Sequence, residues 1–392
     1  MSKRTFLIVG AAVLLFFVGA GCWNRVEIED KAIVAGVGID SDKENKELVK
    51  LTVQIVNPAA LKASAAEGGK EGGGKEAVWL VTAAGSCVFD AVRNFTFQSP
   101  RKLFWAHSKV IVIGEEVAKK GVEKIIDFFM RDHEPYFRTW VLVARGKASE
   151  IMEAKIGLEK IPAYGISDLV SVTTATSQAT AVNLKEFTGM ILSKTTSPFT
   201  TGIEVFEKEG EKRLRLTDTA VFKNFRLKGW LNKEETRGLL WILGKVKSGI
   251  IDLKWSAKDG KHVSIEIIRA SSRVTPEIKD GDITITVDIS EEGNIGEDEM
   301  LFADFITPAG IKSLEKKKTE VIKREIKAAI KKAQEFNTDI FGFGEAVYRK
   351  FPMEWKKIEE EWEKIFPTLK VTIKVTAKIR RTGLISEPIK PE

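Results

Sequence analysis

Histidine and cysteine are scarce in this sequence of 392 residues, which has three histidines and two cysteines. Nucleophilic and metal-dependent sites draw mostly on these two residue types, arranged in short motifs. The sequence has no G-x-S-x-G, C-x-x-C or H-E-x-x-H motif. His107, His133 and His262 are far apart along the chain, and none of them stands beside Cys87. These shortages indicate a protein that is not an enzyme and that holds no cofactor and no metal.

A strong excess of one charge is also missing. Lysine and arginine number 62 against 55 acidic residues, so the net charge is +7. Basic and acidic residues alternate throughout, as they do on a solvated surface. The basic stretch KIRRTG near the C-terminus has no interleaved aromatic residues of the kind that stack on single-stranded nucleic acid. We therefore expect no nucleic-acid partner, whereas an anionic membrane surface agrees with the sign of the charge.

Long hydrophobic runs are limited to one, at the N-terminus. Residues 6–20 form an apolar run of 15 residues that follows Lys3 and Arg4. A permanent membrane span needs about 20 apolar residues, so this run is short for one. A positive segment, a short apolar run and then small residues are the layout of an export signal. The sequence predicts a signal peptide over residues 1–21.

Cys22 lies directly after the small residues Gly19, Ala20 and Gly21. This is where lipoprotein signals place the cysteine that receives a diacylglycerol, although Gly19 stands where leucine is usual. We predict cleavage after Gly21 and lipid attachment to Cys22. Two acyl chains suffice for stable anchoring in a membrane. An unlipidated secreted protein and an uncleaved anchor are the alternatives.

The other cysteine, Cys87, lies in the stretch AAGSCVFDAV. It has no partner for an internal disulfide once Cys22 is acylated. Its apolar neighbours predict a small buried hydrophobic side chain.

The pattern of apolar residues predicts a mixed α/β, multidomain protein with mixed sheets and packed helices. Strands are expected at residues 31–41, 48–56, 78–83 and 109–113, and helices at 86–94 and 115–130. Residues 196–202, TSPFTTG, are expected to form a loop, which places a domain boundary near residue 200. We thus expect an N-terminal domain over 22–200 and a C-terminal domain over 201–392.

The C-terminal part contains the clearest helix, a long amphipathic one. Apolar residues recur along one face of residues 307–336, with lysines on the other face. We expect this helix to pack on a sheet; a coiled coil is the alternative, but sustained heptads are absent. A stripe of Trp355, Ile358, Trp362 and Ile365 predicts a shorter helix, and residues 369–383 predict a final strand.

Three further patterns suggest chemistry, and each has a simpler interpretation. Gly69, Gly74 and Lys75 fit G-x-x-x-x-G-K, but Glu76 stands where a phosphate-binding loop needs serine or threonine, so residues 59–77 are expected to be a flexible loop. His133 lies between an aspartate and a glutamate, yet adjacent residues point in different directions, so we expect it to close a helix. Asp40 and Asp42 resemble a carboxylate pair, and are expected to end a strand in a turn.

Four segments together resemble the Ger(x)C family, the lipoprotein C subunits of spore germinant receptors. GCWNRVEIEDKAIVAGVGID (21–40) resembles the start of the mature family members, and PRKLFWAHSKVIVIGEEVAKKGVEKIIDFFMRDHE (100–134) resembles their central block. TDTAVFKNFRLKGWLNKEETRGLLWILG (217–244) is similar to the opening of their C-terminal domain, and VTAKIRRTG (375–383) to their closing strand.

This resemblance implies a non-enzymatic subunit, anchored by lipid on the outer leaflet of the spore inner membrane. Its implied partners are a transporter-like integral-membrane B subunit and an A subunit with its own membrane spans, which together sense small nutrients. The implied fold is mixed α/β with three domains, so the C-terminal half would divide near residue 293. The competing hypothesis is an exported lipoprotein that binds a small-molecule ligand itself.

Overall fold

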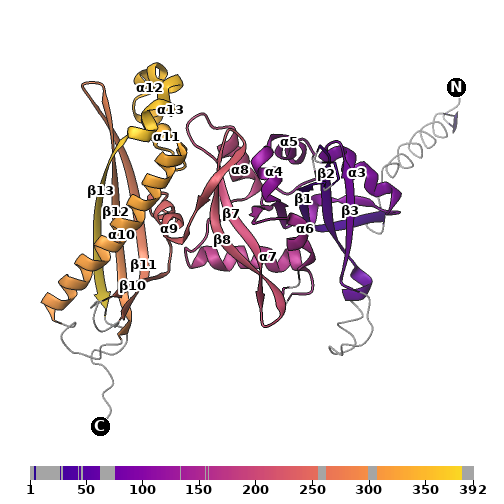
Figure 1. Ribbon diagram of the computed structural model, residues 1–392, viewed down its shortest axis with the longest axis horizontal. Helices are drawn as coiled ribbons and strands as arrows, with labels where there is room; N and C mark the ends of the chain where they lie inside the picture. The colour runs from indigo at the N-terminus through magenta and orange to yellow at the C-terminus, as the bar shows by residue number, and fades with distance from the viewer. Residues whose placement is uncertain are drawn as a thin grey trace, which may run out of the picture.

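The computed structural model describes most of the chain after the N-terminal segment. The described residues are 30–42, 44–45, 47–61, 76–132, 134–154, 156–157, 159–254, 262–298 and 307–381, together with residues 4, 5 and 27. They form two mixed sheets with packed helices, which confirms the predicted mixed α/β class (Figure 1). Cys22, His133, Gly69, Gly74 and Lys75 lie outside the described residues.

The first sheet has nine described strands in the order β3-β2-β1-β5-β6-β7-β8-β9, with β4 paired to the start of β1. The central strands β1, β5, β6 and β7 are parallel, and so is β4 to β1, whereas β2, β3, β8 and β9 join the sheet through antiparallel pairs. The strands are β1 (Lys31–Ser41), β2 (Val49–Val56), β3 (Val78–Gly85), β4 (Lys102–Phe104), β5 (Val110–Ile113), β6 (Trp140–Ala144), β7 (Phe199–Lys208), β8 (Glu211–Lys223) and β9 (Arg226–Leu231).

Helices cover both faces of this sheet, so its central strands are buried on both sides. One face is packed by α3 (Val88–Asn94), α4 (Glu115–Lys120), α5 (Glu123–Arg131) and α8 (Leu184–Ile191). The other face is packed by α6 (Ala148–Glu153) and α7 (Pro162–Ala175). Short 3-10 helices, η3 (Phe95–Phe97) and η4 (Trp105–His107), lie on either side of β4.

The glycines of β1 explain how α6 and α7 approach the sheet so closely. A Cβ atom on Gly36 would lie 2.7 Å from the Cβ of Ala163, and one on Gly38 would lie 2.8 Å from Cγ of Met152. The buried side chain of Gln54 on β2 joins the same helices, since its Nε2 donates to the carbonyl of Met152 and its Oε1 accepts from the N–H of Ala163. The alternating small residues of VAGVG therefore set the spacing between sheet and helices.

The second sheet has four described strands in the order β10-β11-β12-β13. Its strands are β10 (Ile250–Lys254), β11 (His262–Lys279), β12 (Asp282–Asp298) and β13 (Lys370–Arg381). The helices of this half are α9 (Lys233–Ile242), α10 (Pro308–Phe336), α11 (Phe343–Lys350), α12 (Pro352–Ile358) and α13 (Trp362–Ile365), with the 3-10 helices η6 (Glu359–Glu361) and η7 (Phe366–Thr368). The long α10 lies across one face of this sheet, as the sequence predicts for residues 307–336 (Figure 1).

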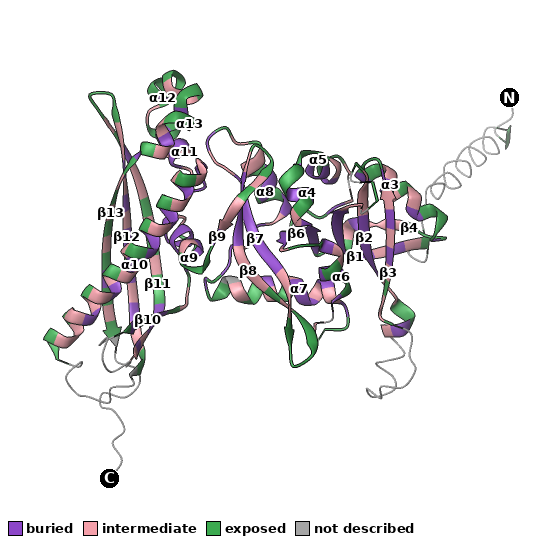
Figure 2. Cartoon of the chain, viewed as in Figure 1, coloured by how far each residue is buried: buried purple, intermediate pink, exposed green. Residues whose placement is uncertain are grey.

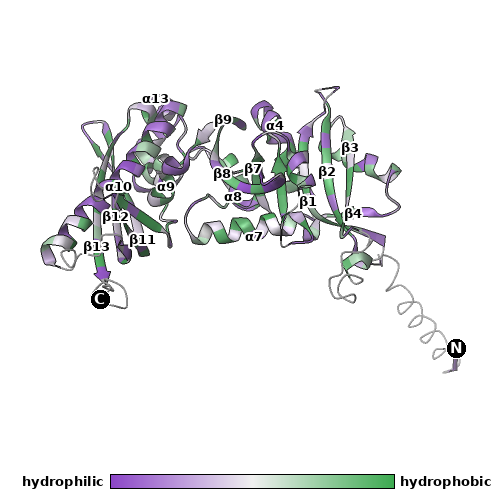
Figure 3. Cartoon of the chain, turned by 60° about the horizontal axis from the view of Figure 1, so that its bottom comes forward, coloured by the Kyte–Doolittle hydropathy of each residue, from purple (hydrophilic) through white to green (hydrophobic). Residues whose placement is uncertain are grey.

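The two sheets share one hydrophobic core. Leu239 and Trp241 of α9 are buried in the same cluster as Val221 of the first sheet and Ile326 of α10. A Cβ atom on Gly238 would overlap the carbonyl oxygen of Glu325, so α9 and α10 meet backbone to backbone. Figure 3 shows hydrophobic residues dominating α7 and the first-sheet strands, whereas the surface of α10 is mostly hydrophilic.

Three sequence-based expectations are wrong in detail. Residues 199–202 belong to strand β7 and not to a loop, because the β-branched Thr200 and Thr201 are buried against β6 and Thr200 donates to the carbonyl of Val141. The helix expected over 115–130 is two helices, separated where Gly121 has φ +138°. The helix expected around Trp355 is likewise divided into α12 and α13.

The predicted domain boundary near residue 200 and the further division near 293 remain predictions. The first sheet itself continues through residue 200 as far as Leu231.

Candidate functional site: the junction between the two sheets

The described residues among those singled out in the sequence lie in separate parts of the molecule. His107 is exposed in η4, with its ring against Phe104 at a centroid distance of 5.8 Å. His262 lies on the second sheet, where its Nδ1 is 2.7 Å from Oδ2 of Asp252. In the part of the chain that the structure describes, no group of three or more His, Cys, Asp or Glu side chains is arranged to hold a metal ion.

Cys87 is exposed, so the prediction of a buried side chain is wrong. Cys87 is the N-cap residue of α3, with an extended backbone at φ −150° and ψ 173°. Its neighbour Val88 turns into the core, while the capping position itself faces solvent. The apolar residues that surround Cys87 in the sequence therefore belong to the helix face and to β3, and not to its own environment.

Asp40 and Asp42 have different structural roles. Asp42 Oδ1 accepts from the N–H groups of Glu44 and Asn45, which confirms the predicted turn. Asp40 is buried within β1 and accepts from the N–H groups of Ala148 and Ser149 at 2.8 Å each. It thus satisfies the free amides at the N-terminus of α6. The two carboxylates are structural.

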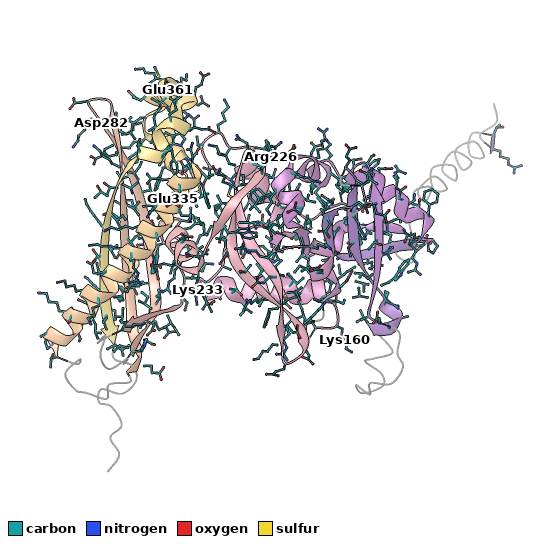
Figure 4. The ribbon with its side chains drawn as sticks, in the orientation of Figure 1. Lys160, Arg226, Lys233, Asp282, Glu335 and Glu361 are labelled. Carbon is teal, nitrogen blue, oxygen red and sulfur yellow. The ribbon has the colours of Figure 1, made fainter. Side chains whose placement is uncertain are left out.

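A polar cavity of about 150 Å³ lies where the two halves of the molecule meet. The first half contributes the segment after α8 (residues 192–198) and the turn between β8 and β9; the second half contributes the segment after α10 and helix α13. Asn224, Phe225 and Asn337 all have positive φ, between 47° and 65°, so tight turns shape both sides. Figure 4 marks the two sides with Arg226 at the start of β9 and with Glu335 and Glu361 on the opposite half.

Asp339 is the buried polar centre of this junction. Its Oδ1 accepts from the N–H groups of Phe341 and Phe343, and its Oδ2 accepts from the N–H of Gly344 at 2.7 Å and from Trp362 Nε1 at 3.2 Å. Burial raises the pKa of Asp339 to about 6, against the opposing effect of these donors. One carboxylate thereby fixes the segment after α10, the start of α11 and the indole of α13.

Contacts from the first half complete the junction. The N–H of Ser197 donates to the carbonyl of Asp339 at 2.7 Å, and Thr195 Oγ1 donates to Glu345 at 3.0 Å. Lys194 and Lys223 form ion pairs with Glu359 and Glu363 across the same boundary. The two halves are therefore joined by directional bonds as well as by the shared core.

A second set of buried polar side chains lies where α10 packs against its neighbours. Lys318 is fully buried, its Nζ is 2.7 Å from Oε2 of Glu291 on β12, and it donates to the carbonyl of Lys378 on β13. Desolvation raises the pKa of Glu291, while Lys318 acts in the opposite direction. Glu325 accepts from Trp241 Nε1 at 2.7 Å, and its pKa is also raised by burial. Lys318 departs from the expectation that the lysines of this helix face outward.

Sequence reasoning did not identify Asp339, Lys318 or Glu325. A usable signal for Asp339 exists in the sequence NTDIFGFGEA, where Asn337 ends one helix and Gly342 begins the next, both with left-handed backbones. For Lys318 the signal is its position, four residues after Leu314 and four before Ile322 on the apolar stripe.

Comparisons with known proteins cover nearly the whole chain. The family described as "Spore germination protein N-terminal domain" matches residues 24–205, and "Spore germination B3/ GerAC like, C-terminal" matches residues 217–383. "Spore germination protein KC" of Bacillus subtilis is 29% identical over 99% of this chain and 98% of its own length. "Spore germination protein B3" of the same organism is 22% identical over 96% of this chain and 98% of its own length.

A solved structure has the same fold. The crystal structure of the GerBC protein superposes with a TM-score of 0.57 at 19% identity, covering 88% of this chain and 96% of that one. Together with the two family matches, this likeness extends over both sheets. The chain belongs to the Ger(x)C family of spore germination proteins, the C subunits of germinant receptors.

Proposed function

We propose that this protein is a lipid-anchored subunit of a spore germinant receptor, held on the outer leaflet of the spore inner membrane through Cys22. Subunits of this family are non-catalytic. In this proposal the chain works beside the membrane-embedded A and B subunits and is needed for nutrient-triggered germination. The observation that carries the proposal is the position of Cys22, at the end of a signal-like run and nine residues before the first strand of the folded body.

The anchor would act by raising the local concentration of the folded body beside its membrane partners. Cys22 lies nine residues before Lys31, the first residue of β1. Even a fully extended chain of that length reaches only about 30 Å. Among the described residues, no helix has both the length and the hydrophobicity to span a bilayer. The lipid is thus the proposed membrane attachment of this body.

The folded body supports a role in interaction. It offers a large ordered surface, and the polar side chains at the junction between the sheets are engaged with one another. A non-catalytic subunit built in this way fits an assembly function.

The second candidate is an exported lipoprotein that binds a small ligand itself, and the junction cavity is the observation in its favour. Its volume of about 150 Å³ is below the range of about 300–1,000 Å³ that is usual for small-molecule sites. Both oxygens of its buried acid, Asp339, already accept hydrogen bonds. Calorimetry of the purified protein with nutrient amino acids and sugars separates the candidates, since saturable heat would favour this one.

The substitution Cys22→Ala tests the anchor. We expect the variant to be released from the membrane fraction and to support little or no germination, with an unchanged circular dichroism spectrum. The control is Cys87→Ala, which removes the other thiol and should leave both localisation and germination intact. Normal germination by the released Cys22→Ala protein would contradict the proposal.

A further inference from the structure

An unusual exposed surface lies at the end of the first sheet where its central strands begin. Strands β1, β5 and β6 are parallel, so they begin at the same end of the sheet; Val110 and Trp140 are level with Gly36, five residues after Lys31. Strand β4 pairs with residues 31–33 there. The segments that lead into β5 and β6 are joined at this edge, because Thr139 Oγ1 donates to the carbonyl of Ser108. The N-terminal segment joins the sheet at this same end, beside β4.

Three exposed aromatic side chains lie in the segments that precede β4 and β6. Phe97 at the end of η3 is 88% exposed, and Tyr136 and Phe137 before β6 are 53% and 48% exposed. Large apolar side chains left this open on a folded protein point to a binding surface when they gather in one region. Figure 2 shows exposed residues gathered around α3 and β4, at the end of the molecule opposite to the second sheet.

Basic side chains accompany the aromatic ones. Together the exposed residues of these segments form what we name the edge surface: Phe97, Arg101, Lys102, Lys109, Tyr136, Phe137 and Arg138. Of the nearby acids, Glu134 is engaged, since its Oε2 accepts from the N–H of Trp105. Glu134 keeps its negative charge in this bond, so the edge surface consists of four bases, Arg101, Lys102, Lys109 and Arg138, with this acid beside them.

We propose that the edge surface rests on the lipid bilayer, with its aromatic rings among the headgroups and its bases on anionic lipid. Aromatic residues favour the membrane–water interface, and each exposed base gains from the negative surface potential of anionic lipid. This inference rests on the proposed lipid anchor, because the short link from Cys22 to Lys31 keeps this edge of the molecule near the bilayer. The anchor supplies proximity, and the edge surface supplies orientation, with the second sheet directed away from the membrane.

Site-specific labelling of the full-length lipoprotein tests this orientation. In a Cys87→Ser background, Phe97→Cys places a nitroxide on the edge surface, and Asp282→Cys places one on the hairpin between β11 and β12 at the other end of the molecule (Figure 4). Both positions are exposed, so both labels should leave the fold intact. The readout is accessibility of each label to oxygen and to a water-soluble nickel complex.

In vesicles containing phosphatidylglycerol, we expect the label at residue 97 to become several-fold more accessible to oxygen and less accessible to nickel. The label at residue 282 should stay in water. Zwitterionic vesicles, high salt, or Arg101→Ser with Lys102→Ser and Arg138→Ser should each reverse most of the change at residue 97. A label at 97 that behaves like the label at 282, or that responds equally to every lipid composition, overturns the proposal.

Flotation of the same samples separates this proposal from the anchor itself. Protein that floats with vesicles while its label at 97 remains in water keeps the anchor and overturns the edge surface. Cys22→Ala protein that still floats, with its label at 97 in the bilayer, supports the edge surface independently of the anchor. Shielding at 97 that needs the A and B subunits and brings no oxygen access identifies a protein partner and overturns the lipid assignment.

Discussion

The two sheets of this protein bury their cores by different means. The first sheet is covered by helices on both faces, and the residues buried beneath α6 and α7 are mostly apolar, with Gln54 and Asp40 as exceptions that bond to backbone groups of these helices. The second sheet has α10 on one face, while the outward residues of β13, such as Lys370 and Lys374, are exposed (Figure 2). Lys318 and Glu325 of α10 and Glu291 of β12 are all buried.

This difference teaches that shape and volume determine the packing of the first sheet, whereas the packing of α10 depends on paired charges as well. A buried ion pair contributes little net stability, but losing one partner leaves an uncompensated charge in the interior. The second half should therefore respond more strongly to single substitutions of charge and to pH than the first half does.

The largest expected effect is that of Lys318→Ala, which leaves Glu291 buried without its cation. We expect a loss of about 3–5 kcal/mol in the free energy of unfolding, measured by denaturant titration. Lys318→Met combined with Glu291→Leu should recover most of this loss. The exposed Lys316→Ala on the same helix is the control, and a loss for it as large as for Lys318→Ala would show that the buried pair is unimportant.

Asp339 should make stability depend on pH. Its pKa rises from 3.8 to about 6 on folding, so its contribution is fully present below pH 3.8 and is lost as pH rises through 6. The loss is on the order of 3 kcal/mol. Asparagine at this position does not titrate, so the stability difference between the wild type and Asp339→Asn should narrow between pH 4 and pH 7. Parallel pH profiles of the two proteins would contradict this assignment; the exposed Asp282→Asn is the control.

Glycine substitutions compare how closely the helices pack in the two halves of the molecule. Gly238→Ala drives a methyl group into the backbone of α10, whereas Gly36→Ala meets side-chain atoms, the nearest 2.7 Å away. Because a backbone yields less than a side chain, we expect Gly238→Ala to cost more within the range of about 1–3 kcal/mol. Gly189→Ala in α8 meets nothing within 4 Å and should be neutral or stabilising in thermal unfolding. A larger cost at Gly36 would reverse the comparison.

The smallest expected effect lies on the first half. Cys87 caps α3 without a side-chain hydrogen bond, and serine is a preferred capping residue. Cys87→Ser should raise the free energy of unfolding by up to about 1 kcal/mol. Cys87→Ala serves as the matched variant without a hydroxyl, and equal stability of the two would show that no cap forms.

Much of the fold could be predicted because its signals are local. The strand at residues 31–41 and the helix at 307–336 follow from apolar residues repeating along short stretches. Strand β7 was missed because its buried threonines resemble a polar loop until their partners on β6 are known. The junction could not be predicted, since Asp339 meets Ser197, Gly344 and Trp362 only after the chain has folded. The edge surface likewise joins residues from separate segments.

The central claim is that a lipid on Cys22 holds a non-catalytic folded body beside the receptor subunits in the membrane. Mass spectrometry of the mature N-terminus, on protein isolated from spore membranes, tests it most directly. The account predicts a chain that begins at Cys22 with a diacylglyceryl thioether on its sulfur. A chain that begins elsewhere, or that carries an unmodified thiol at Cys22, would contradict it.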